Sequence, residues 1–110
     1  MKSLILTSLI AFLFAINTQA QDTKKILKFK VLGNCEMCKK TIENSLDVKG
    51  IKSANWNVDT KIIEVTYLSD KINEDKIYDL VAASGYDSEK KKGDDNAYKA
   101  LPECCQYSRK

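Results

Sequence analysis

Histidine is absent from this chain of 110 residues. Without an imidazole, the chain cannot build a Ser-His-Asp or Cys-His nucleophile system, a mixed Cys/His zinc site or acid–base catalysis by histidine. Strong charge is lacking too: 18 Lys and Arg against 15 Asp and Glu give a formal net charge of +3, which does not indicate nucleic acid binding. The unusual chemistry that remains is sulfur, in Cys35, Cys38, Cys104 and Cys105.

The first 20 residues have the layout of a secretory signal peptide. An early lysine precedes an apolar run from Leu4 to Ile16, and Thr18 and Ala20 stand three and one positions before the expected cleavage site. The run is shorter than the ~20 apolar residues of a membrane-spanning helix, so no stable membrane insertion is expected after cleavage. We expect export, to a periplasm, and loss of residues 1–20 with their one lysine would lower the net charge from +3 to +2.

Two hydrophobic periodicities organise the rest of the chain. Alternation of apolar and polar residues predicts strands, and apolar residues three and four apart predict helices. The expected strands are 24–32, 51–58, 61–68 and 86–92, and the expected helices are 38–49 and 73–84. Asn73 suits a helix N-cap, and Gly85 suits the left-handed position after a helix. This order predicts an α+β, ferredoxin-like βαββαβ sandwich, an antiparallel four-stranded sheet with two helices on one face.

Cys35 and Cys38 are three residues apart at the first strand-to-helix junction of that arrangement. Unpaired backbone N–H groups and the helix dipole favour thiolate over thiol there. Two thiolates with no imidazole suit Cu(I), Hg(II) or Cd(II) better than Mg or Ca. The same spacing also occurs in redox couples and in structural disulfides, which stay as alternatives. The only proline, Pro102, is far along the chain, whereas thioredoxin-like proteins normally place a cis-proline loop against their cysteine pair.

The stretch GNCEMCKKTIENSL, set in this order of elements and with Gly-Tyr opening the last strand, resembles the heavy-metal-associated domain family. That family includes small copper chaperones, N-terminal modules of copper-transporting ATPases and periplasmic mercury-binding proteins. The resemblance covers roughly residues 25 to 92 and places one such domain at 21–92. It implies that Cys35 and Cys38 bind the metal and that Tyr86 shields it.

One position departs from the family pattern. The family usually has Met-x-Cys-x-x-Cys, with its methionine packed into the core, but this chain has Gly33 there and Met37 inside the motif. We therefore expect a differently set loop, in which Met37 is either a weak thioether ligand or part of the loop surface.

The tail at 93–110 carries the adjacent cysteines Cys104 and Cys105. Neighbouring cysteines rarely bond to each other, so other partners are expected. One hypothesis is that the tail folds over the metal loop and adds one or both thiolates, which would suit Cu(I) or, with four sulfurs, Zn(II). The alternatives are disulfides that staple a small exported domain, or an independent thiol pair.

The function expected from these residues is that of an exported soft-metal binder, with Cu(I) the first choice and Hg(II), Zn(II) or Cd(II) the other candidates. It would carry or sequester the ion and pass it on by ligand exchange, without being an enzyme. The family resemblance implies a metal-transporting ATPase or another thiol-presenting protein as partner, and a monomer or a metal-bridged dimer. The alternative is an exported thiol–disulfide redox protein that uses the same cysteine pair.

Overall fold

The computed structural model describes residues 23–109, so the expected signal peptide at 1–20 lies outside the described residues. Within that range no helix is both long and apolar enough to cross a membrane. The elements, in chain order, are β1 Lys24–Lys30, α2 Glu36–Ser45, β2 Ile51–Trp56, β3 Ile62–Leu68, α3 Glu74–Ala83, α4 Asp95–Lys99 and the 3₁₀ turn η3 Glu103–Cys105. Strand, helix, strand, strand and helix therefore follow one another as expected, and the ferredoxin-like architecture is confirmed.

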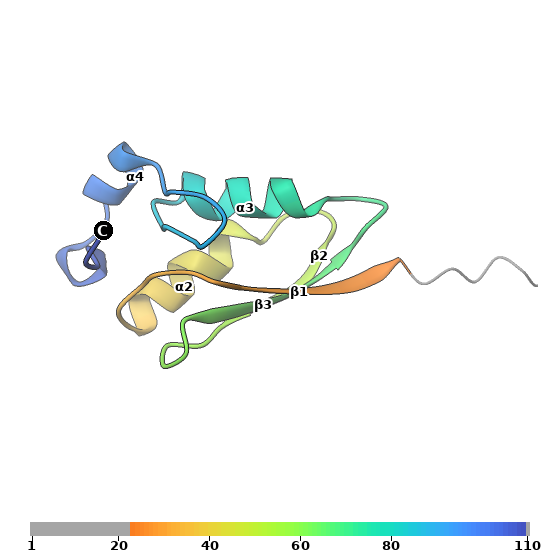
Figure 1. Ribbon diagram of the computed structural model, residues 1–110, viewed down its shortest axis with the longest axis horizontal. Coiled ribbons are helices and arrows are strands. Elements are labelled where there is room, and N and C mark those ends of the chain that lie inside the picture. Colours follow the sequence, from red (N-terminus) through yellow and green to blue (C-terminus); the bar gives the residue numbers. More distant parts are fainter. Residues whose placement is uncertain (1–22, 110) are drawn as a thin grey trace, which may run out of the picture.

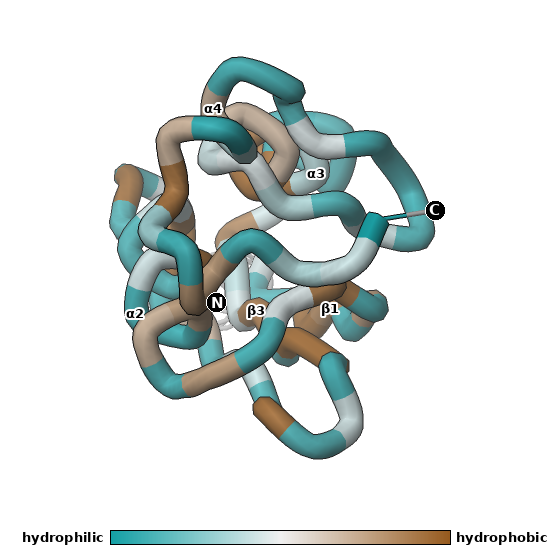
Figure 2. The backbone as a smooth tube through the Cα atoms, turned by 90° about the vertical axis from the view of Figure 1, so that its left-hand side faces the viewer, coloured by the Kyte–Doolittle hydropathy of each residue, from teal (hydrophilic) through white to brown (hydrophobic). Residues whose placement is uncertain are grey.

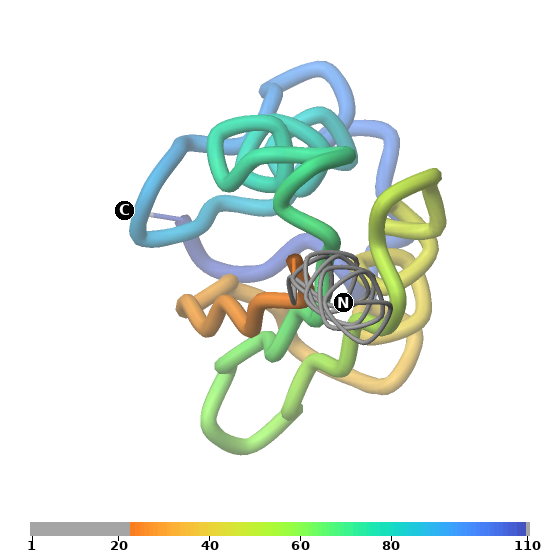
Figure 3. The backbone as a smooth tube through the Cα atoms, turned by 90° about the vertical axis from the view of Figure 1, so that its right-hand side faces the viewer, coloured from red at the N-terminus to blue at the C-terminus, as the bar shows by residue number. Residues whose placement is uncertain are grey.

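The sheet has the order β1-β3-β2, with both pairings antiparallel. Successive side chains along each strand point to opposite faces of the sheet, so one face is buried and the other exposed. On the buried face, Phe29 lies opposite Ile63. On the other face Lys28 forms an exposed ion pair with Glu64 at 3.3 Å. Helices α2 and α3 lie together on one side of this sheet (Figures 1 and 3). The core is thus a single layer of apolar side chains between sheet and helices.

The expected fourth strand is reduced to one isolated bridge, between Val31 and Ser88. Its flanking hydrogen bonds are present, from Leu32 N to the carbonyl of Asp87 and from Glu89 N to the carbonyl of Lys30. The chain then turns at once, because the Ser88 hydroxyl accepts hydrogen bonds from the amides of Lys90 and Lys91, at 3.2 and 3.1 Å. These hydrogen bonds from the backbone to a side chain replace hydrogen bonds to the neighbouring strand, so the β-ladder ends here.

Helix α3 begins and ends where its sequence predicts. The Asn73 side chain accepts a hydrogen bond from Lys76 N at 2.8 Å. Gly85 follows the helix with φ of 97°, a conformation that favours glycine. A Cβ at Gly85 would also lie 2.7 Å from the amide nitrogen of Tyr98 in α4, so the glycine lets the tail approach closely.

The tail after Gly93 folds back onto the domain. In Figure 1, α4 and the last residues lie at the same end as the first turn of α2, and Figure 2 looks onto that end. Tyr98 and Leu101 pack against the core and anchor the tail. Beyond them Cys105 and Tyr107 are buried. The tail is therefore part of the packed structure and not an appendage.

Candidate metal centre

The loop between β1 and α2 is braced by a tryptophan. The indole Nε1 of Trp56 donates to the carbonyl of Val31 at 3.0 Å, and the ring is fully buried. A Cβ at Gly33 would lie 3.0 Å from two carbons of this ring. The departure from the family pattern thus has a physical reason: the indole fills the space beside residue 33, where a methionine side chain would have to go.

Cys35 occupies the N-cap of α2, in an extended conformation and with no capping hydrogen bond from its side chain. The nearby backbone N–H groups, of Cys38 first and then of Met37, favour the thiolate and hold the pKa of Cys35 below its ordinary value. The residue is partly exposed. Cys35 is therefore a thiol that ionises readily and that solvent can reach.

Cys38 lies in the first turn of α2 and is fully buried. Its sulfur accepts a hydrogen bond from the backbone N–H of Asn34 at 3.4 Å. The sulfurs of Cys35 and Cys38 are 3.8 Å apart. The N-terminus of α2 thus brings two sulfurs together, that of Cys38 packed in the core and that of Cys35 open to solvent.

The tail brings a third sulfur to the same place. The sulfur atoms of Cys35, Cys38 and Cys105 all lie within 4.8 Å of one another. Among the described residues, no other group of three or more His, Cys, Asp or Glu side chains is arranged so that it could hold a metal ion. Cys105 is fully buried, and burial raises the pKa of its thiol to about 12. All four cysteines are free thiols in this structure.

The two tail cysteines have different surroundings. Cys104 is exposed, and its sulfur lies 3.9 Å from that of Cys105 and 3.6 Å from that of Met37. Met37 is 51% exposed, so the contact between these two sulfurs is at the surface. Of the residues named from the sequence, Cys105 joins the Cys35–Cys38 pair, whereas Cys104 and Met37 pair with each other outside it.

Tyr86 packs behind the sulfurs. Its side chain is fully buried, and its hydroxyl has no hydrogen-bond partner among the described residues. Burial raises the pKa of Tyr86 well above its usual range, and the nearby sulfurs of Cys105 and Cys38 add to the effect. Tyr86 therefore closes the inner side of the cysteine cluster, with its hydroxyl close to two sulfurs.

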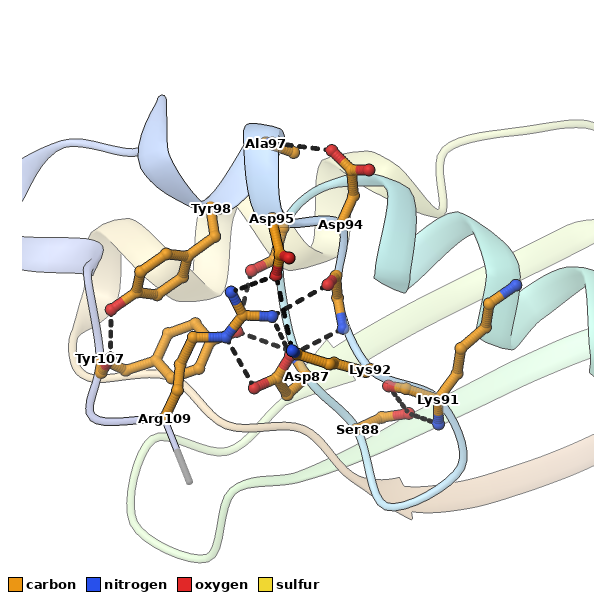
Figure 4. A network of polar contacts seen from close by, with 12 residues as sticks. Asp87, Ser88, Lys91, Lys92, Asp94, Asp95, Ala97, Tyr98, Tyr107 and Arg109 are labelled. Atoms are coloured by element: carbon orange, nitrogen blue, oxygen red, sulfur yellow. Dashed lines mark hydrogen bonds and ion pairs between the residues drawn. The ribbon is translucent and has the colours of Figure 1, made fainter.

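Two residues that hold the cluster together could not be named from the sequence. Asn34 donates from Nδ2 to the carbonyl of Cys104 at 3.2 Å, which ties the metal loop to the tail. Arg109 forms two hydrogen bonds with the carboxylate of Asp87, at 3.0 and 2.7 Å (Figure 4). The one available signal was that Arg109 is the only arginine in the chain.

Comparison with known proteins places this geometry in a family. The model of the heavy-metal-associated domain matches residues 34–87. The chain carries a heavy-metal-associated domain. Comparison with curated protein sequences gives no significant match.

Solved structures of heavy-metal-associated domains share the fold. A structure titled CopZ metallochaperone is 27% identical with a TM-score of 0.56, and the match covers 58% of this chain and 98% of that one. A solution structure of a copper form of a CopA variant from Bacillus subtilis is 25% identical with a TM-score of 0.52, covering 59% and 88%. Oxidized MerP from Ralstonia metallidurans CH34, at 24% identity and a TM-score of 0.56, covers 60% and 94% and shows the fold alone.

The matched heavy-metal-associated segment contains Cys35, Cys38, Met37 and Tyr86, but it ends at residue 87. The third sulfur of the cluster, from Cys105, comes from outside it. The chain is accordingly a metal-binding domain similar to copper chaperones, with a cysteine cluster at the expected loop and an additional tail packed against that loop.

Proposed function

We propose that this protein carries or sequesters Cu(I), held by the thiolates of Cys35 and Cys38. The observation that carries the proposal is their convergence, 3.8 Å apart, at the N-terminus of α2. Soft thiolates select Cu(I) over hard cations, and Hg(II), Zn(II) and Cd(II) are the competing ions. The backbone N–H groups that lower the pKa of Cys35 also offset the negative charge of a dithiolate centre.

Capture begins at Cys35, since it is the partly exposed thiol with the lowered pKa. Cys38 then completes a two-sulfur site from the buried side. Transfer runs in reverse: a thiol of the acceptor bonds the ion while one sulfur of the donor leaves, so the ion never dissociates into water. This is ligand exchange without covalent catalysis, and we propose that the protein is not an enzyme.

The proposed partner is a second thiol-presenting metal protein, such as a metal-transporting ATPase. The similarity to a structure titled CopZ metallochaperone supports the carrier role. We propose that the carrier is a monomer or a dimer in which one ion bridges the Cys35–Cys38 loops of two chains.

Export is the second part of the proposal. It is supported by the segment 1–20 and its small-residue cleavage site. A periplasmic extract from cells that express the full chain should contain a protein whose intact mass is that of a chain beginning at Gln21. A cytoplasmic protein with the full-length mass would contradict export without touching the metal site.

The metal site is tested by Cu(I) competition against a chromophoric chelator, under argon. Wild type should bind one Cu(I) per chain, the Cys35→Ser/Cys38→Ser variant should lose that binding, and Cys104→Ser should retain it. Because Cys38 is buried, each metal-free variant is first checked by circular dichroism. A folded double variant that still binds Cu(I) like wild type would overturn the proposal.

A further inference from the structure

The sulfur of Cys105 lies within 4.8 Å of both sulfurs of the Cys35–Cys38 pair. We propose that Cys105 is the third ligand of the bound ion, so that the tail completes a three-thiolate site. This inference rests on the proposed function of Cys35 and Cys38. It assigns a role to a residue that lies beyond the matched heavy-metal-associated segment.

The spacing of the sulfurs suits a three-coordinate ion. With metal–thiolate bonds of about 2.3 Å, three sulfurs in a plane around one ion lie about 4.0 Å apart. The Cys35–Cys38 distance is already 3.8 Å, and the other two separations do not exceed 4.8 Å. Closing the site therefore requires sulfur movements of less than about 1 Å.

Contacts away from the sulfurs hold the tail, and with it Cys105, in place. Arg109 engages Asp87 through two hydrogen bonds and donates to the carbonyl of Gly93 at 2.9 Å, which fixes the end of the tail (Figure 4). The Tyr107 hydroxyl donates to the carbonyl of Gly85 at 2.8 Å and accepts from Asp87 N at 2.7 Å. Because none of these contacts involves a cysteine, they fix the tail independently of the sulfurs, and binding does not have to order it.

The tail also touches the metal loop directly. The carbonyl of Cys104 accepts from Nδ2 of Asn34 at 3.2 Å and faces the sulfur of Cys35 at 3.8 Å. The sulfurs of the two tail cysteines are 3.9 Å apart, but Cys105 is buried within the cluster of three sulfurs, whereas Cys104 is exposed outside it. The pair therefore supplies one ligand and not two.

A second observation, a buried hydroxyl without an acceptor, concerns the same site. The Tyr86 hydroxyl is fully buried with no satisfied hydrogen bond among the described residues, and the sulfurs of Cys105 and Cys38 are its neighbours. Such a buried donor is costly unless it gains an acceptor. A metal-bound thiolate is a charged acceptor, so loading the site would satisfy the hydroxyl.

Three sulfurs without a fourth favour particular ions. Cu(I) and Hg(II) accept three-coordinate thiolate sites, whereas structural Zn(II) almost always takes four ligands. Binding replaces the S–H bond of the Cys105 thiol by a metal–sulfur bond, and the proton leaves to solvent. We therefore expect the tail to raise the preference for Cu(I) over Zn(II).

X-ray absorption on Cu(I)-loaded protein, in buffer free of small thiols, counts the sulfurs around the ion. Native mass spectrometry of the same samples excludes metal-bridged dimers. We expect three sulfurs in wild type and in the matched control Cys104→Ser, and two in Cys105→Ser. Cys105→Ser should also bind Cu(I) at least about 10- to 100-fold more weakly, since even outer-shell changes cost that much.

Two sulfurs in wild type, or an unchanged affinity in folded Cys105→Ser, would overturn the inference while leaving the two-cysteine carrier intact. Loss of copper from wild type itself would instead remove the proposed function. If Cys105→Ser fails to fold, the sulfur count in wild type and Cys104→Ser still decides the question.

Discussion

Tyr86→Phe, which removes one oxygen atom, should stabilise the metal-free protein and weaken its binding of Cu(I). The hydroxyl is fully buried and has no satisfied hydrogen bond among the described residues. A buried unsatisfied polar group costs about 1–3 kcal/mol. The metal-free variant should therefore be at least as stable as wild type, with a gain of about 1 kcal/mol, which in a domain of this size raises Tm by about 4–8 °C.

In the metal-loaded protein, the same substitution should remove a favourable hydrogen bond and so lower the affinity for Cu(I). If the hydroxyl donates to a metal-bound thiolate, that hydrogen bond contributes about 1.5–3 kcal/mol. Since about 1.4 kcal/mol corresponds to a factor of ten, the Cu(I) affinity of Tyr86→Phe should fall by about 10- to 100-fold. No packing effect of a missing oxygen produces this pair of opposite signs.

The assay pairs thermal unfolding of metal-free protein under argon with chelator competition for Cu(I). Tyr78→Phe is the matched control, because its hydroxyl donates to Glu74 at 3.4 Å on the surface, and its ring packs edge-on against Phe29. The control should bind Cu(I) like wild type. A Tyr86→Phe variant that is clearly destabilised, or that binds Cu(I) with wild-type affinity, would refute the assignment of the hydroxyl to the sulfur site.

Three other changes have expected outcomes. Iodoacetamide should modify Cys35 well before Cys38 in metal-free protein, because one thiol is partly exposed with a lowered pKa and the other is buried; equal rates by peptide mass spectrometry would contradict this. Arg109→Gln should cost about 2 kcal/mol at pH 7 in chemical unfolding. Arg109 lowers the pKa of Asp87, so that stabilisation is full above the unfolded carboxyl pKa of about 3.9 and is lost as the pH falls through the lower folded value; a difference independent of pH would show that the pair does not matter. Gly33→Ala should destabilise by about 1–3 kcal/mol, because its Cβ meets the indole ring at 3.0 Å, and unchanged Tm would be the contrary result.

Much of the fold follows from local patterns. Alternation along β3 places Ile63, Val65 and Tyr67 in the core, and the N-cap at Asn73 starts α3 as its sequence predicts. The fourth strand did not follow, because its end depends on the Ser88 hydroxyl capturing the backbone after a single bridge. That competition between a side chain and the ladder is not visible in hydrophobic periodicity.

The site was predictable only in part. The spacing of Cys35 and Cys38 indicated a pair at a helix start, and the structure places them there. Which tail cysteine turns inward could not be predicted, because it depends on contacts between residues distant in sequence, such as Asn34 with the Cys104 carbonyl and Arg109 with Asp87. Local sequence treats the two tail cysteines as equivalent, and tertiary packing separates them.

The central claim is that these cysteines hold a soft metal as thiolates, and native mass spectrometry of protein purified anaerobically, with Cu(I) added or withheld, tests it most directly. The account predicts a fully reduced chain that gains one copper and keeps it. A chain two or four mass units lighter than the reduced protein, indifferent to added copper, would show that the cysteines work as disulfides and would favour the redox or structural interpretation.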